Sequence, residues 1–114
     1  MFFKKIYTPF FNSFEGIYRA LKEEFSLRIE FLLSVFLIPS SFFMGNNALE
    51  IMLFSGSTLL ILLVELINTS VETTLDRISL EENDLTKYAK DLGSGAVLIS
   101  LILWLVTWSL IVIY

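Results

Sequence analysis

The sequence contains no cysteine and no histidine among its 114 residues. Their absence excludes disulfides, thiolate nucleophiles, imidazole acid–base chemistry and any metal site built from cysteine and histidine. Basic runs are also missing, and the net charge of −4 argues against nucleic acid as a partner. Carboxylates, lysines, amides and hydroxyls therefore remain as the groups that could carry chemistry.

What the chain has in excess is apolar surface. Hydrophobic residues make up 55% of the sequence, and the mean hydropathy is +0.73. A soluble fold of this length could not hide so much apolar surface, because small domains bury a smaller fraction of their surface than large ones. The composition predicts an integral membrane protein, with residues 1–114 forming a single membrane domain.

Three apolar stretches are long enough to cross a membrane as helices, which predicts an all-α fold. Residues 92–114 carry no charged side chain, and a helix of this length crosses about 30 Å of hydrocarbon. The middle stretch begins apolar and then acquires polar side chains, and the first is interrupted by Pro39, where a membrane helix can kink. The predicted spans are 29–45, 48–75 and 92–113, with 76–91 as a loop.

The positions of lysine and arginine predict how these spans are oriented. Basic side chains precede the first span and lie again between the second and third, whereas the link "GNNALE" (45–50) has none. Because cytoplasmic segments carry the excess of basic residues, we expect the N-terminus and the 76–91 loop in the cytoplasm and the C-terminus outside. The basic residues are Lys4, Lys5, Arg19, Lys22, Arg28, Arg77, Lys87 and Lys90.

Residues 1–27 have the pattern of an amphipathic helix. Large apolar side chains recur at helical spacing from Phe14 to Phe25, while charged side chains occupy the other face. Asn12 is expected to cap the start of this helix, with Glu15 three residues later. The pattern fits a helix lying in the cytoplasmic membrane interface, and it fits equally a helix packed on the protein's own bundle.

The stretch "LLILLVELINTSVETTLDR" (59–77) places carboxylates inside the second span. On a helix, Glu72 and Asp76 fall within about 20° of Glu65, and Asn68 lies about 60° away. Polar groups in membranes often only join helices, and Asn68 alone would fit that role. Three carboxylates in register favour a functional site instead, because ionisable groups inside a membrane are costly.

The polar side chains Glu65, Asn68, Glu72 and Asp76 are expected only at the cytoplasmic end of the second span. This position limits the classes of function that they could serve. A transport path would need polar groups across the whole membrane, and the other spans are nearly without them. Two more polar clusters, "KEEFSLRIE" (22–30) and "KYAKDLGSG" (87–95), are expected at the same level. Each alone fits ordinary salt bridges. Together they suit Mg²⁺ and phosphate, at a site where a lipid headgroup meets a water-soluble cosubstrate.

The motifs "VELINTSVETTLDR" (64–77) and "AKDLGSGAVLI" (89–99), with "KEEFSLRIE" upstream, resemble the prokaryotic diacylglycerol kinase family. The resemblance covers nearly the whole chain. It implies a homotrimeric bundle of three-span protomers in the bacterial inner membrane, with active sites shared between protomers. It also implies transfer of the γ-phosphate of Mg-ATP to the hydroxyl of diacylglycerol. Since no glycine-rich phosphate loop is present, Mg²⁺, lysine and loop backbone would hold the nucleotide.

The resemblance further implies roles for individual residues. Glu65 stands at the position of the catalytic carboxylate, which takes the proton from the lipid hydroxyl, and Glu24 and Glu72 stand at the metal-binding positions. The residues implied in binding the lipid or the phosphate are Arg28, Glu30, Glu65, Asn68 and Ser94. Those implied in ATP binding are Lys5 (where the family often has arginine), Asn12, Glu24, Glu72, Glu81, Glu82, Asn83, Lys90 and Asp91.

Two other interpretations are compatible with the sequence. An undecaprenol kinase of the same family would phosphorylate a polyprenol, and "AKDLGSGAVLI" with the tryptophans of the last span favours diacylglycerol only weakly. A non-catalytic membrane subunit or a small ion conductor would use the glutamates for assembly or cation binding. Such a protein would need polar positions towards the outer face, and the sequence has few.

Overall fold

The computed structural model describes residues 2–81 and 83–114, with side chains from Lys5 onward. Over these residues all regular secondary structure is α-helical, and α2, α3 and α4 are by length and composition able to cross a membrane. The predicted all-α fold with three membrane spans is thus confirmed. The helices are α1 (Phe2–Glu23), α2 (Phe25–Met44), α3 (Ala48–Ile78) and α4 (Asp84–Ile113).

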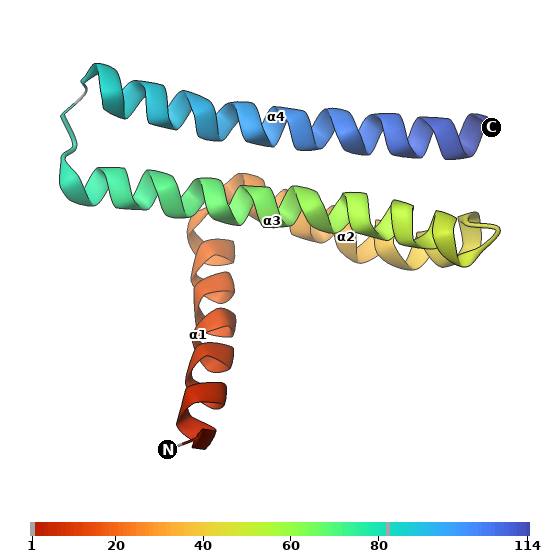
Figure 1. Cartoon of the computed structure of the whole chain (residues 1–114), viewed down its shortest axis with the longest axis horizontal. Helices are drawn as coiled ribbons and strands as arrows, with labels where there is room; N and C mark the ends of the chain where they lie inside the picture. Colours follow the sequence, from red (N-terminus) through yellow and green to blue (C-terminus); the bar gives the residue numbers. More distant parts are fainter. Residues whose placement is uncertain (1, 82) are drawn as a thin grey trace.

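The other three helices all pack against α3 (Figure 1). α4 runs alongside α3 in the opposite direction, α2 lies against another side of α3, and α1 projects sideways from the bundle. An amphipathic helix that lies crosswise to three membrane-spanning helices has the placement that an interfacial helix needs. α3 therefore collects side chains from every other helix, and any site built on it draws on the whole chain.

The ends of the helices extend beyond the apolar stretches. α2 begins at Phe25, where the apolar stretch begins at 29, and α4 begins at Asp84, inside the segment expected as a loop. Asn83 caps α4, because its side-chain oxygen accepts a hydrogen bond from the backbone N–H of Thr86 at 2.9 Å. An uncharged stretch indicates which residues can lie in the hydrocarbon core of the membrane. The helix itself can extend beyond that stretch into water, because its end is capped.

Two local expectations concern α1 and α2. Asn12 lies well inside α1, which starts at Phe2, so its predicted role as an N-cap is wrong. The apolar periodicity begins near Asn12, but the aromatic residues before it continue the same helix.

α2 runs through Pro39 to its end, and the link to α3 follows at once. A Cβ at Gly45 in that link would lie 2.6 Å from the Ile51 side chain, so only glycine permits so close a turn.

Few large apolar side chains are buried within a single chain. The buried ones are Leu27, Phe54 and Ile61, whereas many others are exposed along all four helices. In a membrane such surfaces face lipid or neighbouring protein rather than water. Trp108 packs edge-on against Phe54, with ring centroids 4.6 Å apart, and helps to hold the C-terminal half of α4 on α3.

Candidate active site

The polar face of α3 passes from buried to exposed along the helix. Glu65 is 8% and Asn68 9% exposed, Glu72 is partly buried, and Asp76 is exposed near the end of α3. The four residues follow one another at three- and four-residue spacing, so they share one face. A row of polar side chains therefore leads from the interior of the bundle to the α3–α4 link.

Glu65 lies between α3 and the start of α2. Its Oε1 accepts a hydrogen bond from Ser26 Oγ at 3.3 Å. Glu24 and Glu72 are close enough to Glu65 to repel its carboxylate electrostatically, and Glu30 interacts with it in the same way. Glu65 thus interacts electrostatically with carboxylates of its own helix and of the first residues of α2. Ser26 could not be recognised from the sequence, because one serine in a charged segment gives no sign of a contact 39 residues away.

Of the predicted metal ligands, Glu72 lies on α3, the helix that carries Glu65, and Glu24 lies at the start of α2. Glu24 is the N-cap residue of α2 but makes no side-chain capping hydrogen bond, which leaves its carboxylate available. Glu72 Oε1 accepts a hydrogen bond from Asn68 Nδ2 at 3.3 Å. Within the described residues, no group of three or more metal-ligating side chains forms a site by itself. Two carboxylates nevertheless fit Mg²⁺, which completes its shell with phosphate oxygens and water.

Two lysine–aspartate pairs lie at the exposed end of the polar face. Lys90 Nζ, on α4, lies 2.9 Å from Asp76 Oδ1 on α3, and these side chains are 41% and 49% exposed. Lys87 Nζ lies 2.8 Å from Asp91 Oδ2 within α4. The structure thus brings Lys90, a predicted nucleotide ligand, to the polar face of α3. Asp91, also a predicted nucleotide ligand, pairs with Lys87 on an exposed surface.

The other residues predicted to bind ATP are spread over α1 and the α3–α4 link. Lys5 is exposed near the start of α1, and Asn12 lines a hollow of about 430 Å³ between α1 and α3. Glu81 is exposed in the link, and Asn83 is engaged in capping α4. Glu82 lies outside the described residues. Their roles at the nucleotide stay predictions.

The residues predicted to bind lipid differ in their surroundings. Arg28 Nη1 donates a hydrogen bond to the Lys22 carbonyl oxygen at 3.0 Å, and its guanidinium lies over the Phe25 ring. Ser94 is exposed on α4, one turn beyond Lys90. Both side chains are exposed and therefore accessible at the surface.

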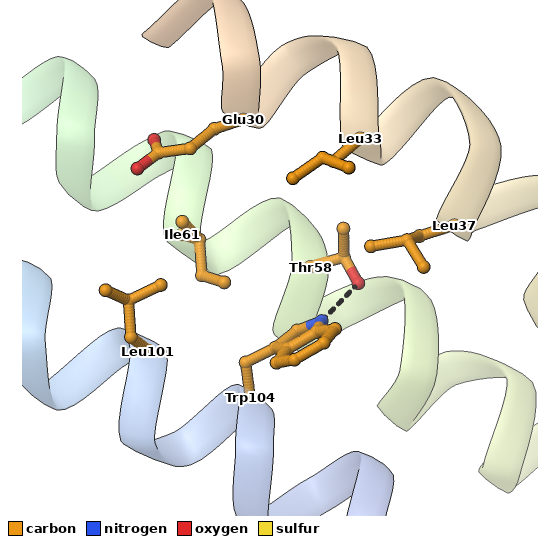
Figure 2. Close-up of a pocket in the computed structure, with 7 residues that line it drawn as sticks. All are labelled: Glu30, Leu33, Leu37, Thr58, Ile61, Leu101 and Trp104. Atoms are coloured by element: carbon orange, nitrogen blue, oxygen red, sulfur yellow. Dashed lines mark hydrogen bonds between the residues drawn. The ribbon is translucent and has the colours of Figure 1, made fainter. Parts of the chain in front are cut away.

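Glu30 borders a hollow of about 120 Å³ between α2, α3 and α4 (Figure 2). Its Oε2 is buried and has no hydrogen-bond partner within the described residues. Trp104 Nε1 donates a hydrogen bond to Thr58 Oγ1 at 3.1 Å beside the same hollow. A carboxylate next to an apolar hollow suits a ligand with a polar head and an apolar chain. The remaining lining residues are Leu33, Leu37, Ile61 and Leu101.

Comparison with known proteins decides the family. A profile of prokaryotic diacylglycerol kinases matches residues 11–112. The chain belongs to the prokaryotic diacylglycerol kinase family. The diacylglycerol kinase of Haemophilus influenzae is 42% identical over 96 residues, which are 84% of this chain and 81% of that protein. That of Pseudomonas aeruginosa is 39% identical over 110 residues, 96% of this chain and 89% of that protein.

The diacylglycerol kinase of Escherichia coli strain K12 is 31% identical over 99 residues, 87% of this chain and 81% of that protein. The family assignment made from the motifs around Glu65 and Lys90 is therefore confirmed, and with it the kinase and membrane character of the protein. As a member of this family the chain is an ATP-using enzyme of the bacterial inner membrane. Similarity along the whole chain does not assign roles to single residues, which stay predictions.

Proposed function

We propose that this protein transfers the γ-phosphate of Mg-ATP to the free hydroxyl of 1,2-diacylglycerol, giving phosphatidic acid. The observation that carries this proposal is the position of Glu65. It is a buried carboxylate at the inner end of a polar face that leads outward to Lys90. A lipid hydroxyl can approach Glu65 from the membrane, and a nucleotide can approach from the exposed end. The names of the relatives support diacylglycerol as the acceptor.

The reaction depends on alignment and charge neutralisation rather than on a covalent enzyme intermediate. The Glu65 carboxylate takes the proton of the lipid hydroxyl while the hydroxyl oxygen bonds to the γ-phosphorus. The bond from that phosphorus to the β–γ bridging oxygen breaks, and ADP leaves. Ser26 donates to Glu65 Oε1 and so fixes the orientation of the carboxylate. Mg²⁺ held by Glu24 and Glu72 would offset the negative charge of the triphosphate.

Lys90 is the cation proposed to contact the phosphates. Its contact with Asp76 holds the ammonium group over the exposed end of the polar face. An ammonium group has three donors, so a phosphate oxygen can bind to it beside Asp76 or in its place. Lys90 would thus guide the nucleotide to the end of α3 that lies near the two glutamates.

We also propose that a homotrimer completes the site. Glu65 is buried between α2 and α3, whereas Asp91 pairs with Lys87 on an exposed surface of α4. The two predicted site residues thus belong to different surfaces of one chain, and a neighbouring protomer could unite them. The exposed apolar side chains of α2, α3 and α4 offer contact surface for such an assembly. Each active site would then combine Glu65 of one protomer with Asp91 of the next.

The proposed orientation places the N-terminus and the α3–α4 link in the cytoplasm and the C-terminus outside. Basic residues gather on α1, at the start of α2 and around the α3–α4 link, and the α2–α3 link has none. ATP would then reach Lys90 from the cytoplasm.

The direct test offers purified protein labelled ATP with diacylglycerol and undecaprenol side by side in mixed micelles. We expect label in diacylglycerol, with an absolute requirement for Mg²⁺. Label in undecaprenol alone would identify an undecaprenol kinase. A folded protein that labels neither lipid would favour the non-catalytic subunit or the ion conductor.

A further inference from the structure

Gly93 of α4 lies directly against the side chain of Asn68 on α3. A Cβ built on Gly93 would collide with Asn68 Oδ1 and would lie 3.1 Å from Asn68 Cγ. Gly95, two residues later in the same helix, has open space at the corresponding position. The close approach is therefore specific to Gly93 and not a property of this part of α4.

The Asn68 amide has one fixed orientation in this contact. Its Nδ2 donates to Glu72 Oε1, while its Oδ1 is buried with no hydrogen-bond partner within the described residues. A rotation that exchanged the two ends of the amide would turn the oxygen towards the Glu72 carboxylate, which can only accept. The hydrogen bond to Glu72 thus sets the orientation of the amide, and the missing side chain of Gly93 leaves room for its oxygen.

We propose that Gly93 is a positioning residue for phosphoryl transfer. Its missing side chain admits the Asn68 amide between α3 and α4, and that amide orients the Glu72 carboxylate, which would hold Mg²⁺. The inference rests on the proposed function, in which Glu72 is a ligand of Mg²⁺. Partners that orient ligating carboxylates matter for metal binding, and their loss typically lowers metal affinity about 10- to 100-fold.

The substitution Gly93→Ala isolates this contact. The added methyl group would occupy the place of Asn68 Oδ1 and drive the amide away from Glu72. Alanine is a better helix former than glycine, so α4 itself is not weakened. A neighbouring hollow of about 160 Å³ can receive the displaced side chain, and we expect the variant to fold. The hollow is lined by Val64, Ile67, Asn68, Val71, Gly93 and Ala96.

The first measurement is the Mg²⁺ concentration that gives half-maximal kinase activity. Gly93→Ala and Asn68→Ala should each raise it about tenfold, because both take the amide from Glu72. Gly95→Ala is the matched control and should leave it unchanged. In the double variant Gly93→Ala/Asn68→Ala the methyl group has no amide to displace, so the effect should not exceed that of Asn68→Ala alone.

The second measurement needs neither metal nor turnover. The chain has five asparagines and no glutamine, so an ¹⁵N spectrum of the protein in micelles holds five side-chain amide pairs. The pair that disappears in Asn68→Ala belongs to Asn68. We expect this pair to shift in Gly93→Ala and to stay in place in Gly95→Ala.

An unmoved Asn68 signal in Gly93→Ala would overturn the inference, and so would a further rise in Mg²⁺ requirement in the double variant. If Gly93→Ala fails to fold and the double variant folds, the rescue itself demonstrates the collision. If neither folds, Asn68→Ala alone decides, because an unchanged Mg²⁺ requirement there overturns the inference. A wild-type protein that phosphorylates no lipid would instead overturn the proposed function, and with it this role of Gly93, whatever the amide signal shows.

Discussion

The two halves of α3 satisfy their buried polar groups in different ways. In the half that begins at Ala48, the hydroxyls of Ser57 and Thr58 both donate to the carbonyl oxygen of Phe54, in their own helix. Buried serines elsewhere in the bundle behave alike: Ser41 donates to Ile38 O and Ser100 to Val97 O. The hydrogens of these hydroxyls are therefore bonded within their own helix and require no acceptor on a neighbouring helix.

The half that ends at Ile78 depends on other helices. Glu65 accepts from Ser26 of α2, and Asp76 pairs with Lys90 of α4. A carboxylate only accepts hydrogen bonds, and the interior of a helix has no free N–H to offer it. Its donors are therefore side chains, which come from Asn68 of the same helix for Glu72 and from Ser26 of α2 for Glu65. Because buried carboxylates are costly, we expect them in a membrane helix only where they have a function. Hydroxyls that donate to their own helix can instead serve helix packing alone.

The sharpest test of this division substitutes one glutamate in each half. Glu65→Gln keeps the shape of the side chain and removes the proton acceptor, so we expect turnover to fall at least about 100-fold with folding unchanged. Glu50→Gln is the control, since Glu50 lies at the opposite end of α3, where it accepts a hydrogen bond from the backbone N–H of Asn46. Its turnover should match the wild type. Kinase assays in mixed micelles measure the turnover of both variants. Near-normal turnover in Glu65→Gln would show that Glu65 is not the catalytic base.

The sequence predicted the features of α3 that depend on a single segment of the chain. Apolar runs predicted three membrane spans, and helical periodicity placed Glu65, Asn68, Glu72 and Asp76 on one face, because both depend on spacing along one segment. The contact of Ser26 with Glu65 depends instead on how α2 is placed against α3. No local pattern contains that register.

The same limit applies between α3 and α4. The sequence predicted that Lys90 lies near the cytoplasmic surface, but its pairing with Asp76 follows from the length of the α3–α4 link and the early start of α4 at Asp84. The need for glycine at position 93 was likewise hidden, since its reason is a side chain on another helix. Contacts within a helix were predictable, and contacts between helices were not.

The metal prediction assigns different roles to two adjacent glutamates, Glu23 at the end of α1 and Glu24 at the start of α2. Glu24→Gln and Glu72→Gln should each raise the Mg²⁺ concentration for half-maximal rate by about tenfold or more, because each removes an anionic ligand. Glu23→Gln is the control, since Glu23 pairs with Arg19 on the exposed side of α1. It should leave the Mg²⁺ dependence unchanged. A fall in rate at unchanged Mg²⁺ dependence would show that Glu24 and Glu72 act in another way.

The assembly prediction asks whether the polar half of α3 is complete within one chain. Glu65→Gln and Asp91→Asn should each be inactive as pure proteins. If sites combine residues of two protomers, random co-assembly at equal amounts leaves about a quarter of the sites with both residues intact. We therefore expect recovery of about a quarter of wild-type activity. No recovery at any mixing ratio, with co-assembly shown independently, would mean that each chain builds its own site.

The smallest expected effect lies in the apolar half of α3, where two neighbouring hydroxyls differ in one bond. Both donate to Phe54 O, but Thr58 Oγ1 also accepts from Trp104 Nε1 of α4 at 3.1 Å. Hydrogen bonds between membrane helices contribute about 0.6 kcal/mol on average, so Thr58→Val should lower the free energy of unfolding by about that amount. Ser57→Ala loses only a bond within its own helix and should change it by less. Unfolding by SDS titration in mixed micelles measures both variants. An equal loss in Ser57→Ala would mean that hydroxyls bonded to their own helix also stabilise the bundle, and the contrast between the halves of α3 would fail.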